Sequence, residues 1–494
     1  MSHVETTVVW FRRDLRVRDH QALTAAAARG QVVCVYVLDP RRWEAASARG
    51  RQLEGPRAGP HRTRFLLASV QALRASLRSL GGELVVLVGP AEDRLPGLLR
   101  EVSATALHYH QDIGVEAGQE ERAVAAAAAA LDVEVQPFWD RTLIAPEDLP
   151  FAVARTPESF SSFRKKVERE RRYVAPIAAP DQLRFGPSPP SDPLPDVEAL
   201  AGAAAVDDPR ASPRAVGGEA EAWRRLRTWW WEQDRLKSYK QTRNGMLGDA
   251  YSSRLSPWLA QGCISARSVQ AEVERYERER VQNESTYWMT FELLWRDYFQ
   301  WITQKHGAAL FRASGLQGVP VPWERDEAAF SRWRDGRTGF PIVDACMREL
   351  SATGSLSNRG RQIVTSFLTK NLGVDWRWGA EWFEATLIDY DVGSNYGNWN
   401  YGAGVGNDSR GFRYFHLATQ ADKYDRDGAH ARHWCSELAQ LPARCVHAPW
   451  TASKDELAAA GVALGRSYPE RMVDLERSAD RNRARWERAM CATP

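Results

Sequence analysis

The sequence predicts a protein of two domains, in which an α/β domain with a doubly wound parallel sheet precedes an all-helical domain. Over the first 145 residues, short β-branched runs alternate with helical stretches. Beyond residue 218, nearly every segment repeats its apolar residues with the 3.6-residue period of a helix. A chain of 494 residues is also too long for a single hydrophobic core, which favours separate domains.

The α/β domain is expected over residues 1–145. Near-continuous apolar strands, typical of a sheet covered on both faces, are predicted at 7–11, 32–38, 84–88, 106–109 and 133–136. Helices are predicted between them at 21–29, 62–80, 94–102 and 116–130. Gly30 and Gly81 fall where helix C-caps belong. The first strand is not followed by GxGxxG, so dinucleotide binding of the Rossmann type has no support in this domain.

A connector is expected over residues 146–217, and the helical domain follows it. The connector holds one short charged helix, predicted at 160–172, and then a proline-rich stretch that we expect to lie over the surface. The helical domain is expected over 218–485, before a short tail at 486–494. Its helices are predicted at 219–238, 265–280, 285–305, 340–351, 358–372 and 378–387.

Charge and cysteine content limit the class of function. The 66 basic and 63 acidic residues leave a formal net charge of +3, which permits a local basic groove but excludes a histone-like tail. The 6 cysteines form no CxxC pair, so we expect neither a metal centre nor a secreted disulfide framework. The N-terminus lacks a secretion signal, and the apolar run 123–131 is less than half a membrane span. We therefore expect a cytoplasmic monomer that is not attached to a membrane.

Polar side chains interrupt the apolar stripes of three helical segments. In 287–305, Glu292, Trp295, Arg296 and Phe299 have i, i+3, i+4, i+7 spacing and so share one helix face. A charge there must be paired or must contact a polar ligand, and an internal ion pair remains an open alternative for this motif alone. The other two stripes contain Asn358, Arg361 and Gln362, and Asp389, Asp391 and Asn395.

Taken together, the three stripes predict a pocket for a large, partly charged aromatic ligand. Glycines at 393, 397, 402, 404 and 406 predict that the backbone approaches this ligand closely.

Several motifs, in order along essentially the whole chain, carry a family resemblance. VVWFRRDLRVRDHQAL, SRLSPWLAQGCIS and the block from RGRQIVTSFL to DYDVGSNYGNW resemble the photolyase/cryptochrome superfamily. Within it, ELLWRDYF, SNRGRQ, SNYGNW and GVGND are similar to the cryptochrome-DASH branch. The resemblance implies an antenna role for the α/β domain and FAD bound in the helical domain.

The resemblance assigns flavin contacts to named positions. Hydroxyls and backbone N–H groups leading into a helix suit a pyrophosphate. Arg361 and Asp389 match a salt bridge beside the flavin ring, Asp391 a ring contact, and Asn395 the residue facing flavin N5. The remaining implied FAD contacts are Tyr239, Ser252, Ser253, Arg254, Leu255, Ser256, Arg296 and Asn358.

Two further features concern electrons and light. Of the 20 tryptophans, Trp399, Trp376 and Trp323 match the family's electron-transfer chain, although each alone would be read as a core residue. The segment YHQDIGVEAGQEE resembles the part of the DASH proteins that holds 5,10-methenyltetrahydrofolate as an antenna. Asp112 stands there where glutamate is common, so another chromophore or none stays an alternative.

The implied activity is repair of cyclobutane pyrimidine dimers by light-driven electron transfer from reduced FAD, as a deoxyribodipyrimidine photo-lyase. The damaged bases are flipped out of DNA into the pocket. Glu292 matches the carboxylate that bonds a base, and Trp295 and Tyr401 the aromatic residues beside it. Arg243, Arg359 and Arg413 match positions that contact the DNA backbone.

Two departures favour single-stranded DNA as the partner. Met289 and Tyr401 stand where duplex-specific photolyases often have tryptophan, which weakens the aromatic clamp. A duplex-DNA dimer photolyase is one alternative. A signalling cryptochrome without repair activity is the other. Retention of Glu292 favours repair, as does the expectation that no long extension follows the flavin domain.

Overall fold

The computed structural model describes residues 5–44, 55–170, 173–212, 214–408 and 411–492. Five parallel strands form one sheet in the order β3-β2-β1-β4-β5. Their bounds are β1 (Thr6–Phe11), β2 (Gln31–Leu38), β3 (Leu84–Val88), β4 (Ala106–His110) and β5 (Glu134–Phe138). All five predicted strands are present. Pro137 lies in β5, where its missing N–H is tolerated because β5 is an edge strand.

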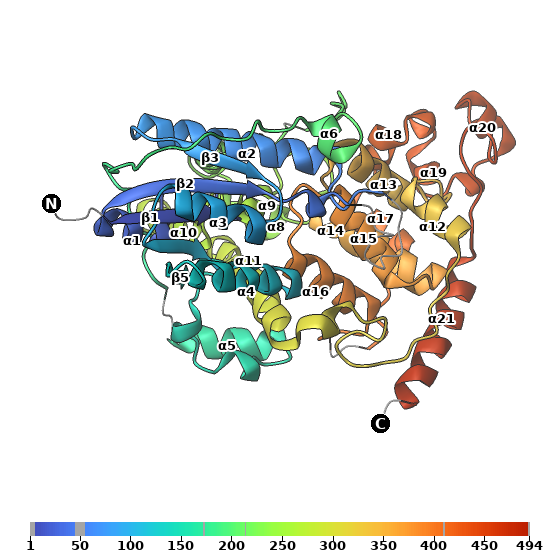
Figure 1. The fold of residues 1–494 in the computed structure, drawn as a ribbon. Coiled ribbons are helices and arrows are strands. Elements are labelled where there is room, and N and C mark those ends of the chain that lie inside the picture. Colours follow the sequence, from blue (N-terminus) through green and yellow to red (C-terminus); the bar gives the residue numbers. More distant parts are fainter. Residues whose placement is uncertain (1–4, 45–54, 171–172, 213, 409–410, 493–494) are drawn as a thin grey trace.

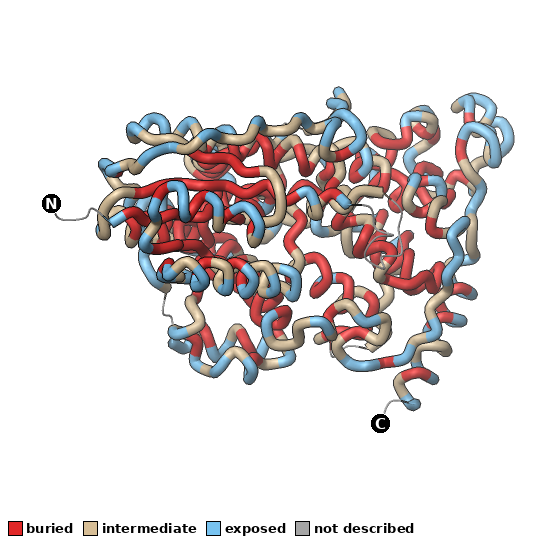
Figure 2. The backbone as a smooth tube through the Cα atoms, viewed as in Figure 1, coloured by how far each residue is buried: buried red, intermediate tan, exposed pale blue. Residues whose placement is uncertain are grey.

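Helices cover both faces of this sheet (Figure 1). They are α1 (Gln21–Arg29), α2 (Pro60–Ser79), α3 (Ala91–Glu101) and α4 (Val115–Ala129). Successive strand residues point to opposite faces, so Val9 and Phe11 pack in the core that includes residues of α1 and α2, whereas Val8 and Trp10 pack with α3 and α4. The doubly wound α/β prediction is confirmed, and Figure 2 shows strands buried between their helices, whereas the edge strand β5 is only partly covered.

The later domain is helical, as predicted, and the connector between the two domains has little regular structure apart from short helices. The helices of the connector are α5 (Phe160–Glu170) and α6 (Val197–Ala201), and residues 171–172 of the predicted helix lie outside the described residues. The later helices are α7 (Glu219–Leu226), α8 (Tyr239–Thr242), α9 (Ser256–Gln261), α10 (Ala266–Glu279), α11 (Glu284–His306), α12 (Glu327–Arg334), α13 (Pro341–Thr353), α14 (Asn358–Ser366), α15 (Trp376–Thr386), α16 (Val392–Ala403), α17 (Leu417–Tyr424), α18 (Ala429–Trp434), α19 (Ala443–Val446), α20 (Lys454–Ala459) and α21 (Leu475–Cys491).

Two long predicted helices change their winding. The segment predicted at 219–238 is α7 followed by a π-helical turn at Arg227–Glu232, because both Trp229 and Trp230 are fully buried and the wider turn lets adjacent indoles face the core. The segment predicted at 358–372 is α14 followed by a second π-helical turn at Phe367–Leu372. Asp375 caps α15, which therefore starts two residues before the predicted helix.

The connector is fastened to the sheet. Val32 of β2 donates to Arg184 O, and Asp192 donates to Val86 O of β3. The domain boundaries at 145, 217 and 485 stay predictions, and α21 continues through residue 486. Within the described ranges, no helix is both long and apolar enough to cross a membrane.

Candidate functional site

A cavity of about 790 Å³ lies among α8, α11, α14, α16 and the loop that precedes α9. This volume falls in the range of about 300–1,000 Å³ that ligand sites occupy. Most of the predicted site residues line it: Tyr239, Arg243, Ser252, Arg254, Ser256, Glu292, Trp295, Arg296, Asn358, Arg359, Arg361, Asp389, Asp391, Asn395, Trp399, Tyr401 and Arg413.

The loop before α9 presents alternate side chains to the cavity. Ser252, Arg254 and Ser256 line it, whereas Ser253 and Leu255 are buried. Phosphate contacts of Ser253 and Leu255 would therefore come from their backbone N–H groups, and they stay predictions. The backbone at Arg254 has a left-handed φ of +53°, and this turn directs its two neighbours away from the cavity.

Arg225 of α7 holds this loop in shape, and no sequence motif pointed to it. Its guanidinium donates to the carbonyl oxygens of Asp249, Ser252 and Ser253 at 2.8, 3.0 and 2.9 Å. Three backbone acceptors on one guanidinium fix the loop, so the hydroxyls that line the cavity are preorganised.

Asp389 connects the loop to α14. Arg361 Nη2 lies 3.0 and 2.8 Å from its two carboxylate oxygens, and Ser256 Oγ donates to it at 2.7 Å. The Asp389 side chain is buried, which strengthens the pair relative to one in water. The two residues of the predicted salt bridge are thus in contact on the cavity wall.

Asp391 caps α16, the helix that carries Asn395, Trp399 and Tyr401. Its carboxylate accepts from Ser394 N at 2.8 Å, from Gln300 Nε2 at 2.6 Å and from Arg141 Nη2 at 2.6 Å. Burial alone would raise the pKa of Asp391, but Arg141 and then Arg296 outweigh it and hold the pKa well below its usual range. The carboxylate is therefore charged at neutral pH.

Asn395 has a fixed orientation on α16. Its Nδ2 donates to Ala380 O at 2.9 Å, which leaves the amide oxygen as the group that can accept from a ligand. Arg296, on the facing helix α11, donates to Arg141 O and to Leu259 O. Burial lowers the pKa of the Arg296 guanidinium, and the nearby Arg141 lowers it further.

Glu292 and the predicted DNA-contacting arginines lie on the same cavity. Arg243 Nη2 is 2.6 Å from Glu292 Oε1, and Trp288 Nε1 donates to the same oxygen at 3.1 Å. Burial raises the pKa of Glu292, and Arg243 offsets part of this rise. Arg359 donates to Asn244 Oδ1 at 3.0 Å, and Arg413 lies over the Phe415 ring.

Trp295 is flanked by aromatic rings from two other elements. Phe160 of α5 stacks on it with centroids 3.7 Å apart and planes at 13°, and Tyr401 meets it edge-on at 5.9 Å. The sequence did not indicate Phe160. Met289 does not belong to this group, because it is 4% exposed and packs in the core rather than along the cavity. Its predicted place in an aromatic clamp was wrong.

The three candidate electron-transfer tryptophans are all placed in the helical domain, and one of them reaches the cavity. Trp399 lines it and is buried. Trp376 and Trp323 lie outside it, and their indole N–H groups donate to the same carbonyl, Ala313 O, at 3.1 and 3.0 Å. A shared acceptor keeps these two indoles adjacent.

The glycines of α16 serve protein packing rather than ligand approach. A Cβ at Gly397 would meet the Phe299 ring at 2.3 Å, and one at Gly402 would meet Thr365 at 2.6 Å. Of the five glycines singled out in the sequence, only Gly402 lines the cavity. The expectation that glycines bring the backbone close to a ligand was wrong for Gly393 and Gly397, which let α16 pack against α11, and it stays a prediction for Gly402.

Buried polar atoms on the cavity wall indicate a polar ligand. Gln362 Oε1 and Trp399 Nε1 are buried and have no hydrogen-bond partner among the residues that the structure describes. A buried group left without a partner costs roughly 1–3 kcal/mol, so such groups are usually satisfied by a ligand or water. With the hydroxyl loop and the Arg361–Asp389 pair, this donor and acceptor set fits FAD.

A second cavity, of about 890 Å³, lies between the α/β domain and the helical domain, and Asp112 lines it. The Asp112 carboxylate contacts Arg13 Nε at 3.1 Å and Arg141 Nε at 3.2 Å. Burial would raise the pKa of Asp112, but Arg141 and Arg13 outweigh it and lower the pKa. Asp112 is therefore a charged wall residue that is already paired.

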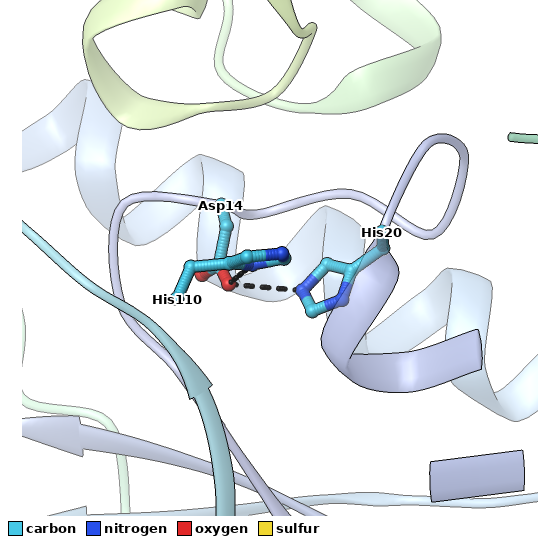
Figure 3. A group of neighbouring side chains, drawn as sticks. All are labelled: Asp14, His20 and His110. Atoms are coloured by element: carbon cyan, nitrogen blue, oxygen red, sulfur yellow. Dashed lines mark hydrogen bonds and ion pairs between the residues drawn. The ribbon is translucent and has the colours of Figure 1, made fainter. Parts of the chain in front are cut away.

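Asp14, His20 and His110 form a compact buried group near the sheet (Figure 3). Asp14 Oδ2 lies 2.9 Å from His20 Nε2 and 2.7 Å from His110 Nδ1. His20 caps α1, and its Nδ1 accepts from Leu23 N, so the ring proton is on Nε2 and faces Asp14. Burial lowers the pKa of His20 to about 4, which keeps the ring neutral. His20 thereby connects the start of α1 to Asp14 and, through it, to His110 at the end of β4.

Fold and cavity together define an FAD-binding protein of photolyase architecture. A family profile described as the FAD binding domain of DNA photolyase matches residues 288–488, and one described as DNA photolyase matches residues 7–181. A curated relative, cryptochrome DASH of Gloeobacter violaceus, is 51% identical over 98% of this chain and 96% of its own length. The chain belongs to the cryptochrome-DASH family of the photolyase/cryptochrome superfamily.

Solved structures support this assignment. The crystal structure of the Synechocystis cryptochrome is 44% identical, with a TM-score of 0.93, and the match covers 98% of this chain and 100% of that one. An archaeal photolyase of Sulfolobus tokodaii, described with two FAD molecules and a novel light-harvesting cofactor, is 26% identical. Its TM-score is 0.77, over 98% of this chain and 100% of that one.

Proposed function

We propose that this protein repairs cyclobutane pyrimidine dimers, mainly in single-stranded DNA, by light-driven electron transfer. The observation that carries the proposal is that one cavity holds both sets of residues. The Arg361–Asp389 pair and Asn395 suit the flavin, and Glu292, Trp295 and Tyr401 on the same cavity suit a flipped pyrimidine dimer.

The cofactor would be held along the cavity by groups of matched chemistry. The hydroxyls of Ser252 and Ser256, with Arg254 and Tyr239, would bind the pyrophosphate. Asn395 would accept from flavin N5, and Asp391, Arg296 and Asn358 would orient the ring. When bound and reduced, FAD supplies the electron that light drives into the dimer. Trp399, Trp376 and Trp323 would carry the electrons that restore the reduced state.

The protein's own task in repair is to position the dimer and stabilise charge. Glu292 would bond a base, while Trp295 and Tyr401 would contact the extruded dimer. Arg243, Arg359 and Arg413 would bind DNA phosphates. Single strands avoid the unpairing and unstacking of a few kcal/mol that duplex DNA requires, and an edge-on tyrosine returns less stacking than a second indole.

The second cavity is proposed as the antenna site for 5,10-methenyltetrahydrofolate. Asp112 would accept from the amino edge of the pterin while it remains shared with Arg13 and Arg141. Another chromophore is the competing occupant. Fluorescence of the purified holoprotein, with folate extraction and quantification, distinguishes the two.

One repair assay tests the proposed function. The reduced holoprotein would be illuminated with the same dimer in single-stranded and in duplex oligonucleotides at matched salt. We expect efficient repair of the single strand and weak repair of the duplex. Equal repair of both would favour a duplex photolyase, and no repair of either would favour a signalling cryptochrome. We further infer that the protein acts as a cytoplasmic monomer, which light scattering and cell fractionation test.

A further inference from the structure

Arg141 bridges the two cavities. It lies in the chain just after β5, and its side chain is 4% exposed. Its Nε is 3.2 Å from Asp112 Oδ1, on the wall of the second cavity, and its Nη2 is 2.6 Å from Asp391 Oδ2, on the wall of the flavin cavity. Among the described residues, Arg141 is the one that has ion pairs with both carboxylates.

Each carboxylate also has an anchor of its own. Asp112 keeps Arg13 at 3.1 Å and accepts from Ile113 N at 2.8 Å. Asp391 keeps Gln300 Nε2 and Ser394 N. The two aspartates therefore stay in place when the balance at Arg141 changes. What changes is how the charge of one guanidinium is divided between a hydrogen-bonded ion pair with Asp391 and an ion pair without a hydrogen bond to Asp112.

Burial makes this division matter. The side chains of Asp112 and Asp391 are 13% and 5% exposed, so solvent screens the three charges only weakly. Arg141 is tied to the flavin cavity a second time, because Arg296 donates to its carbonyl oxygen. A change in the Arg141–Asp112 ion pair would thus reach charged groups on the wall of the flavin cavity.

We propose that Arg141 is a positioning residue that couples the two cavities. A ligand in the second cavity that donates N–H groups to Asp112 would weaken the Arg141–Asp112 ion pair and leave more of the Arg141 charge to Asp391, and this would make the flavin easier to reduce. The inference rests on the proposed placement of the flavin beside Asp391. Reduction adds electrons to the flavin, so a more positive surrounding would stabilise the reduced state. By linkage, flavin reduction would tighten binding of that ligand to the same extent.

The test measures the flavin reduction potential of the holoprotein, without DNA. Asp112→Asn removes the competing carboxylate and imitates full release of Arg141. We expect the ratio of reduced to oxidised flavin at fixed ambient potential to rise about tenfold, which is about 30 mV for a two-electron couple. Arg141→Gln should lower the ratio by a similar factor. In the Arg141→Gln background, Asp112→Asn should have less than half of its wild-type effect, expressed in millivolts.

Two further backgrounds separate coupling from other effects. Gln300→Met removes a neutral bond to Asp391 without touching Asp112, so the Asp112→Asn shift should persist in it. Arg141→Lys keeps the charge, but a single ammonium cannot hold both carboxylates in the guanidinium geometry, so the shift should shrink in it. This variant also replaces Arg141→Gln if the latter does not fold.

Equal Asp112→Asn shifts in the wild-type, Arg141→Gln and Arg141→Lys backgrounds would overturn the proposal, because a through-space field is additive and needs no bridge. Loss of the Asp112→Asn shift in the Gln300→Met background would also overturn the proposal, since the flavin potential would then respond to the loss of any bond to Asp391. Failure of dimer repair in the wild type would overturn the proposed function instead, and the flavin reduction potentials could still be measured and compared.

Discussion

Arg243 Nη2 lies 2.6 Å from Glu292 Oε1, so the candidate phosphate ligand and the candidate base ligand are bonded to each other on the cavity wall. The Arg243 guanidinium is also 5.5 Å from the centroid of Trp288, which donates to Glu292 as well. Substrate binding would therefore replace one partner of the Glu292 carboxylate by another, and the carboxylate would not be left without a partner. This arrangement presents a preformed acceptor to the substrate.

Glu292→Ala should lower the quantum yield of repair more than it lowers DNA affinity. The carboxylate is expected to meet the base as charge arrives, so it stabilises the reacting state preferentially. A hydrogen bond to a charged group is worth roughly 1.5–3 kcal/mol, so a loss of at least severalfold in quantum yield is expected. Photorepair yield and fluorescence anisotropy with the same oligonucleotide check it. Glu284→Ala, on the exposed start of the same helix, is the matched control, and equal losses in yield and affinity would point to a structural role.

Trp376→Phe should nearly abolish photoreduction of oxidised flavin while FAD stays bound. Phenylalanine keeps an aromatic ring and most of the buried volume but is much harder to oxidise than indole. Repair should survive when the flavin is reduced chemically beforehand. Trp333→Phe is the control, because Trp333 is equally buried and does not belong to the proposed electron-transfer chain. The centroids of the Trp333 and Trp399 rings are 6.3 Å apart. Undiminished photoreduction in Trp376→Phe would mean that the electrons take another route.

The sequence predicted the sheet, the helical domain and most of the cavity wall, because hydrophobic period and local motifs are properties of contiguous residues. It could not reveal Arg141, Arg225 or Phe160. Each of these acts on residues far away in the chain, and only tertiary packing brings them together. The same limit explains Met289, whose motif position gave no information on which side of α11 faces the core.

Lys370 should make stability depend on pH. It is buried in the π-helical turn after α14 and donates to Ala403 O at 2.5 Å. Burial lowers its pKa from 10.5 to about 7, and Asp408 offsets part of the shift. Because the unfolded chain binds this proton more tightly, its contribution to the free energy of unfolding rises with pH between about 7 and 10.5.

Between pH 7 and 9 this gain should be about 2 kcal/mol. Urea unfolding of the wild type and of Lys370→Met would be measured at each pH. The difference between their free energies of unfolding should rise by this amount from pH 7 to pH 9, because the variant lacks the gain. The exposed Lys165→Met serves as the control, and its free energy of unfolding should depend on pH as that of the wild type does. If the free energy of unfolding of Lys370→Met depends on pH as steeply as that of the wild type, Lys370 stays charged throughout this range.

Tyr401→Trp should narrow the gap between single-stranded and duplex substrates. Tyr401 meets Trp295 edge-on, with centroids 5.9 Å apart, and an indole in its place would offer a larger face to an extruded base. Each base–aromatic stack contributes roughly 1–3 kcal/mol, comparable with the few kcal/mol required to extrude a dimer from duplex. Repair of the duplex should therefore increase more than repair of the single strand. At limiting substrate, we expect the ratio of duplex to single-strand repair to rise about tenfold.

The control for this change is Arg359→Ala, which removes a proposed phosphate contact. It should weaken binding of both substrates alike and reduce the slope of log affinity against log salt by about 1, because the contact carries no information on strandedness. Met289→Trp should not narrow the gap, since its side chain lies in the core and a larger ring there would strain the packing. If Tyr401→Trp improves single-strand and duplex repair equally, stacking at this position does not set the preference, and the cause must lie in the backbone contacts.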